Sequence, residues 1–136
     1  MTFESMDDAL YTSTSEVRFR DTDAMGIVNH AVIVSYLENT RTEYLYDVLE
    51  IDGVEEINFL IARVECDLRS PVRYGDTVRC GIIIPSIGNK SFTMGYRLEQ
   101  ESTGQLVAEA QTVQVFYDYE RQASIAVPDE FRRAVM

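Results

Sequence analysis

The stretch from His30 to Glu50 constrains the fold most, because it is the one long segment with helical periodicity. No Gly or Pro interrupts it, Asn29 before it is a suitable N-cap residue, and Gly53 lies just beyond its end. Its apolar residues recur at helical spacing, at Ile33, Leu37, Tyr44 and Val48. About twenty residues predict a helix about 30 Å long, and its apolar side needs a large surface to cover it.

The residues before this helix indicate one strand. Residues 1–12 are expected to form a loose acidic lead-in. From Thr14 to Arg20 apolar and polar side chains alternate, which places Val17 and Phe19 on one face of a half-buried strand. A turn-rich connector, Asp21–Asn29, then leads to the helix.

The rest of the chain predicts four strands joined by short turns. The strands are expected at Asn58–Arg69, Thr77–Ser86, Ser91–Glu101 and Gln105–Asp118, and a short turn follows Pro128. In the first of them we expect core positions at Ile61, Val64, Cys66 and Leu68. One early helix and several strands predict an α+β fold in which an antiparallel sheet surrounds the helix. The edges of such a small sheet favour pairing between subunits.

Length and composition exclude several classes of protein. A chain of 136 residues predicts a single domain, residues 1–136. No apolar run approaches the roughly 18 residues of a membrane span. Residues 1–8 carry acids rather than the basic start of a signal peptide, so we expect a cytoplasmic protein. His30 is the only histidine, and Cys66 and Cys80 make neither a disulfide framework nor a metal cluster, so no metal site is expected.

The charge balance is strongly acidic. Asp and Glu number 23 against 12 Lys and Arg, which gives a formal net charge of −11. This charge repels a phosphate backbone, so nucleic-acid binding is not expected. Lys90 is the only lysine among the basic residues. An acid-rich, lysine-poor surface is typical of proteins that work in high salt. A GC-rich genome would also raise the arginine content, but it does not explain the excess of acids.

The residues Asp21–His30, just before the helix, form the densest cluster of groups that could take part in catalysis. The carboxylate of Asp23 can act as nucleophile or general base, and free amides at a helix start can stabilise an oxyanion. Gly26 allows a ligand to approach the backbone closely. His30 could bond to the substrate or orient the carboxylate. Taken alone, however, Asp and Asn before a helix are more often turn formers or caps than catalysts.

The segment VRFRDTDAMGIVNHAVIVSYLENTRTEYL, Val17–Leu45, resembles hotdog-fold acyl-CoA thioesterases of the 4-hydroxybenzoyl-CoA thioesterase type. Looser landmarks recur in the same order as in that family: Pro71 with Tyr74–Asp76, Gly88–Ser91, Val107–Asp118 and Ile125–Pro128. The resemblance covers roughly residues 13–128. It implies the hotdog fold, in which a curved antiparallel sheet wraps around one long central helix.

The same resemblance implies roles for individual residues. Asp23 matches the catalytic carboxylate of the family, and His30 matches an active-site histidine of one bacterial branch. The backbone that polarises the thioester carbonyl in the family matches Gly26, Ile27 and Val28. The turn near which coenzyme A lies matches Lys90 and Ser91.

Assembly and acyl specificity follow less directly from the resemblance. Family members are dimers or tetramers with active sites between subunits, so a homodimer or homotetramer is implied. Ile33 stands where the family often has tyrosine, which leaves the acyl group open.

These observations predict a thioesterase that converts an acyl-CoA to a free acid and coenzyme A. No cofactor is expected beyond the coenzyme A of the substrate, because a thiolate with a pKa near 8.5 leaves readily without a metal. The alternative is a non-hydrolytic protein that binds acyl-CoA or an acyl carrier as a sensor or partner subunit. Glu38 is a second carboxylate to consider, but its spacing from Arg41 is typical of a surface ion pair.

The excess of acidic groups predicts that stability depends on the salt concentration. The repulsion between acidic groups acts over about 30 Å at 0.01 M salt and about 3 Å at 1 M. If the composition reflects a saline cytoplasm, the melting temperature and the oligomeric state should both rise steeply from low salt to molar KCl. Thermal unfolding and light scattering at the two salt levels check this. A melting temperature flat within a few degrees, with an unchanged oligomer, would contradict the interpretation.

Overall fold

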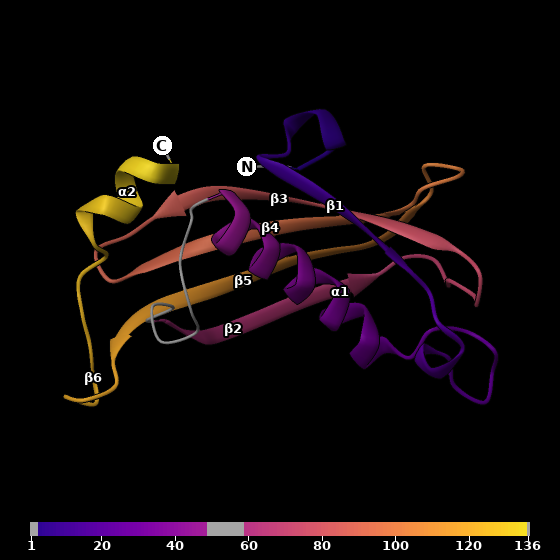
Figure 1. Ribbon diagram of the computed structural model, residues 1–136, viewed down its shortest axis with the longest axis horizontal. Coiled ribbons are helices and arrows are strands. Elements are labelled where there is room, and N and C mark those ends of the chain that lie inside the picture. Colours follow the sequence, from indigo (N-terminus) through magenta and orange to yellow (C-terminus); the bar gives the residue numbers. More distant parts are fainter. Residues whose placement is uncertain (1–2, 49–58, 136) are drawn as a thin grey trace.

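The computed structural model describes residues 3–48 and 59–135, and Figure 1 shows a curved sheet with one long helix across its concave face. The main helix is α1 (His30–Glu43), continued by the wider turn η3 (Tyr44–Val48). The strands are β1 (Tyr11–Glu16), β2 (Phe59–Leu68), β3 (Thr77–Ile87), β4 (Ser91–Gln100), β5 (Leu106–Asp118) and β6 (Ala123–Ser124). Two short turns, η1 (Met6–Asp8) and η2 (Phe19–Asp21), precede α1, and α2 (Asp129–Val135) ends the described chain.

The strands form one antiparallel sheet in the order β1-β3-β4-β5-β2, with β6 beside β5. The predicted α+β class and the hotdog arrangement of sheet and helix are therefore confirmed. No helix in the described ranges is both long and apolar enough to cross a membrane.

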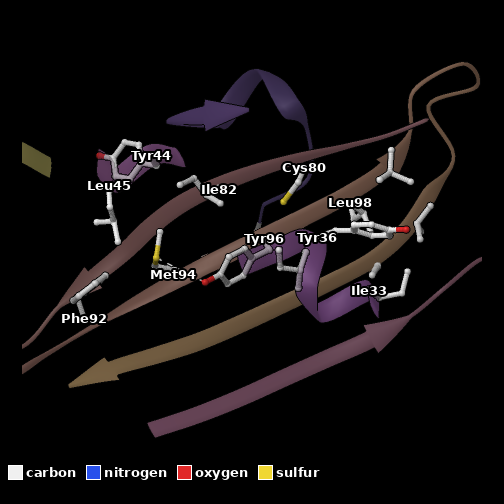
Figure 2. Packing of buried hydrophobic residues seen from close by; sticks show 14 of the residues in the cluster. Ile33, Tyr36, Tyr44, Leu45, Cys80, Ile82, Phe92, Met94, Tyr96 and Leu98 are labelled. Carbon is white, nitrogen blue, oxygen red and sulfur yellow. Dashed lines mark hydrogen bonds between the residues drawn. The ribbon is translucent and has the colours of Figure 1, made fainter. Parts of the chain in front are cut away.

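The core fills the space between α1 and the middle strands. Leu37 of α1 is 2 % exposed, and five inward residues of β3 and β4 are at most 2 % exposed: Ile82, Phe92, Met94, Tyr96 and Leu98. Figure 2 shows Ile33 and Leu98 toward one end of this cluster and Phe92 toward the other. At the Phe92 end, Phe131 of α2 packs on Phe92 with the ring centroids 4.6 Å apart, which ties α2 to the sheet.

The first strand differs from the prediction. It runs from Tyr11 to Glu16 rather than from Thr14 to Arg20, so it begins inside the segment expected as a loose lead-in. Its length follows from its partner, because Glu16 lies opposite Thr77, where β3 begins. Val17 is buried as expected, but Phe19 is 76 % exposed, since the chain has already turned away from the sheet.

The helix begins where the sequence predicts and ends differently. The side chain of Asn29 accepts a hydrogen bond from the amide of Ala31 at 2.9 Å, which confirms it as the N-cap. Regular α-helix ends at Glu43 instead of Glu50. Gly53, the residue expected beyond the helix, lies outside the described residues.

The core positions predicted in β2 are the largest error. Ile61, Val64 and Leu68 are 37, 48 and 55 % exposed. They do lie on the inner face of the sheet, because they stand opposite inward residues of β5. The helix, however, packs mainly against β1 and β3, so the described residues leave these three side chains of the edge strand β2 largely uncovered.

Candidate active site

The loop between η2 and α1 is held by backbone hydrogen bonds. The amide of Asp23 donates to the carbonyl of Ile27 at 2.9 Å, and the amide of Val28 donates to the carbonyl of Val72 at 2.8 Å. Gly26 has φ +79°, a backbone conformation that residues with a Cβ seldom adopt. The loop is thereby fastened to the segment before β3, and the start of α1 is fixed with it.

The two aspartates of the loop have different surroundings. One oxygen of Asp21, Oδ2, accepts hydrogen bonds from the amide of Arg18 at 2.9 Å and from the hydroxyl of Tyr36 at 2.8 Å. Burial, together with this carboxylate, raises the pKa of Tyr36 well above its usual value. Asp21 is thus a structural residue that ties the loop to α1.

Asp23, in contrast, is exposed and borders a pocket. Its Oδ1 accepts a hydrogen bond from the amide of Met25 at 2.8 Å, which leaves Oδ2 without a partner in the described part of the chain. The pocket has a volume of about 460 Å³. It is lined by Asp23, Ile27, Val28, His30, Ile33, Leu68, Arg69, Ser70, Pro71 and Val72. The structure therefore brings Asp23 and His30 together with Ile27 and Val28 of the predicted backbone segment, whereas Gly26 does not line the pocket.

Half of this lining was missed from the sequence. Residues 68–72 run from the last residue of β2 into the segment before β3, where the sequence predicts only the end of a strand and a turn. They reach the pocket because Val72 pairs with Val28 across the loop. The signal available in the sequence was Pro71 in a turn directly before a strand, which does not by itself indicate where the turn lies.

The amide groups near α1 are not all free to bind a substrate. The amide of Gly26 donates to the carbonyl of Asp23 at 2.9 Å, and that of Val28 is bonded to Val72. Among the described residues, neither the amide of Ile27 nor that of His30 has an acceptor. His30 is the first residue of α1, so its amide lies at the positive end of the helix dipole. Of the three predicted backbone donors, only Ile27 keeps a free amide.

Lys90 and Ser91 lie at the other end of the sheet. They stand at the turn between β3 and β4, on the side of α2, whereas the Asp23 loop lies where β3 begins (Figure 1). The eleven residues of β3 span about 33 Å. One chain does not bring Lys90 to the pocket.

Two further candidates from the sequence stay outside the pocket lining. Glu38 is 54 % exposed and lies 4.0 Å from Arg41, as expected for a surface pair. Burial raises the pKa of Cys80 to about 12, so its thiol remains protonated at neutral pH.

Comparison with known proteins agrees with the fold described above. Residues 17–135 match the family described as the Thioesterase-like superfamily. The chain belongs to this thioesterase-like superfamily. The expectation of a thioester hydrolase is thus confirmed at the level of the family, while the narrower 4-hydroxybenzoyl-CoA type stays a prediction.

Individual members of the thioesterase-like superfamily are similar over nearly the whole chain. The acyl-CoA thioester hydrolase YbgC of Escherichia coli is 28% identical over 127 residues, which cover 90% of this chain and 93% of that protein. The 1,4-dihydroxy-2-naphthoyl-CoA hydrolase of Nostoc punctiforme is 27% identical, covering 88% and 82%. A Thermus thermophilus thioesterase, solved with coenzyme A and Zn, is 30% identical with a TM-score of 0.84, covering 93% and 92%.

The contrast between the two aspartates gives a prediction about stability. Asp21→Ala removes the acceptor of Tyr36 and of the Arg18 amide, so the free energy of unfolding should fall by about 1–3 kcal/mol. Asp23→Ala serves as the matched control, because its carboxylate bonds only to an exposed amide, and its stability should change by less than about 1 kcal/mol. Urea unfolding followed by circular dichroism measures both. Equal losses would contradict the division of roles.

Proposed function

We propose that this protein hydrolyses acyl-CoA thioesters to a free acid and coenzyme A at the pocket beside Asp23. One observation carries the proposal: a carboxylate oxygen without a partner borders an apolar pocket at the start of α1. A thioester carbonyl held there would have a nucleophile or base on one side and a helix N-terminus on the other. The membership in the thioesterase-like superfamily supports the same chemistry.

The reaction can proceed in two ways from this geometry. In the first, the Asp23 carboxylate attacks the carbonyl carbon, the thiolate of coenzyme A leaves, and water then cleaves the resulting anhydride. In the second, Asp23 takes a proton from a water molecule that attacks the carbonyl directly. In both, the carbonyl oxygen gains negative charge and needs hydrogen-bond donors. We assign this role to the amide of His30, because it is unpaired and lies at the helix dipole.

We further propose that the working unit is a dimer formed through β2. This strand is at the edge of the sheet, and the described residues leave its inner side chains Ile61, Val64 and Leu68 exposed. Pairing with the β2 of a second copy would cover the open edge and these side chains. If the two β2 strands pair antiparallel about a two-fold axis, the end of β2 in one subunit lies beside the beginning of β2 in the other. Lys90 of the partner subunit would then approach the pocket of Asp23, where its charge can meet the phosphates of coenzyme A.

The catalytic role of Asp23 is tested by its closest isostere. Asp23→Asn keeps the shape and the bond from Met25 but lacks an ionised oxygen, so the turnover of acyl-CoA should fall by about 10²–10⁴-fold. Release of thiol from a panel of acyl-CoA esters measures it. Turnover within about threefold of wild type would contradict the role. Tight binding by wild type without any release would favour a non-hydrolytic protein.

The dimer and the role of Lys90 are tested together by mixing variants. Lys90→Ala alone should raise the KM for acyl-CoA more than it lowers kcat. When it is refolded with Asp23→Asn, a mixed dimer contains one site with both residues intact, so part of the activity should return with the KM of wild type. Lys90→Arg, which keeps the charge, is the matched control. If the activity of the mixture equals the sum of the activities of the two variants measured alone, a site shared between subunits is contradicted.

A further inference from the structure

The turn that carries Lys90, between β3 and β4, is held firmly at its backbone. The amide of Gly88 donates a hydrogen bond to the carbonyl of Ser91 at 2.7 Å, which closes the turn. The carbonyl of Lys90 accepts a hydrogen bond from the amide of Phe116 in β5 at 2.9 Å. The side chain of Lys90 is exposed, and among the described residues no carboxylate forms an ion pair with it. The turn therefore presents a cation to solvent from a fixed backbone.

The C-terminal segment holds the other two carbonyl groups of this turn. The amide of Val127 donates a hydrogen bond to the carbonyl of Asn89 at 2.8 Å, and the guanidinium group of Arg132 donates one to the carbonyl of Gly88. Arg132 belongs to α2, which lies at the end of the sheet where β3 passes into β4 (Figure 1). Its neighbour Phe131 packs on the aromatic rings of the core at this end. Arg132 thus joins the turn to a helix that is itself fixed to the core.

The bond from Arg132 to the turn adds little to the stability of the fold. The carbonyl of Gly88 lies in an exposed turn, so water can take the place of the guanidinium group when Arg132 is replaced. What changes is the freedom of the turn, because its first residue would then be held only from within. A ligand that binds the side chain of Lys90 would have to immobilise the turn as well, and this costs entropy.

We propose that Arg132 is a positioning residue for the binding of coenzyme A: it holds the turn so that Lys90 projects toward the phosphates of the ligand. This rests on the proposed function for the role of Lys90. The phosphates of coenzyme A are negatively charged, and the net charge of −11 repels them from most of the protein surface. Lys90, the only lysine of the chain, offsets this repulsion best when little entropy is lost on binding.

A double-mutant cycle distinguishes positioning from a merely structural role. If Arg132 acts through Lys90, its replacement weakens the binding of coenzyme A only while Lys90 is present. If Arg132 merely supports the fold, or binds the ligand by itself, its replacement weakens binding equally with and without Lys90. The cycle therefore combines Arg132→Gln with Lys90→Ala.

Calorimetry with coenzyme A itself measures the cycle without requiring turnover. Lys90→Ala should raise the Kd by about five- to twentyfold, because one charged contact to phosphate is lost. Arg132→Gln should raise it by about three- to tenfold in the presence of Lys90, and by less than about 1.5-fold in its absence. The melting temperatures of all three variants should stay within a few degrees of wild type. Equal effects of Arg132→Gln in the two backgrounds would overturn the proposal.

Two further variants separate position from charge. Arg133→Gln is the matched control, because it removes the same charge from the next residue of α2, and among the described residues no hydrogen bond joins Arg133 to the turn. It should change the Kd by less than about 1.5-fold. Arg132→Lys keeps a charged donor at the same position and should stay within about twofold of wild type. Equal losses in Arg132→Gln and Arg133→Gln would overturn the proposal.

The binding experiment and the test of hydrolysis fail independently. If wild type releases no thiol from any acyl-CoA while the coupling between Arg132 and Lys90 is observed, the proposed hydrolysis fails and the positioning role stands. If hydrolysis depends on Asp23 but coenzyme A binds equally well to wild type and to Lys90→Ala, the positioning role fails. Wild type that does not bind coenzyme A would also overturn it.

Discussion

The backbone hydrogen bonds between the Asp23 loop and the segment before β3 determine the rest of the site. Through the bond from Val28 to Val72, the end of the loop is fastened to the segment before β3, and α1 begins directly after it. Two further contacts fix the orientation, the cap at Asn29 and the bond from Tyr36 to Asp21. Asp23 is thus positioned by its neighbours, and its own carboxylate keeps an oxygen for chemistry. A reactive group on a rigid support loses little entropy in reaching its substrate.

The second constraint is the mismatch between one helix and a wide sheet. α1 packs mainly against β1 and β3, and the sheet extends beyond it to β2, where Ile61, Val64 and Leu68 are left exposed by the described residues. Leu68 also lines the pocket beside Asp23. The exposed face therefore accounts for the proposed dimer, because a second copy can cover it.

Part of this site could be predicted from the sequence. The helix start at Asn29, the position of Asp23 and the presence of His30 follow from local patterns and from the resemblance of one continuous segment. The lining by residues 68–72 could not be predicted, because it depends on a pairing between segments more than forty residues apart. The prediction of the backbone amides that could stabilise an oxyanion was only partly correct. Which amides are free depends on hydrogen bonds with Val72 and within the turn, and these have no signature in the side chains.

The sequence by itself determined the strands after the helix, the turns between them and the α+β class, because periodicity and turn residues act over a few neighbouring positions. It also determined the face of β2 on which Val64 and Leu68 lie, since side chains alternate along any strand. Only the tertiary structure decided whether that face is covered. The alternation that marks an inner face is the same for a central strand and for an edge strand, and the position in the sheet depends on long-range pairing.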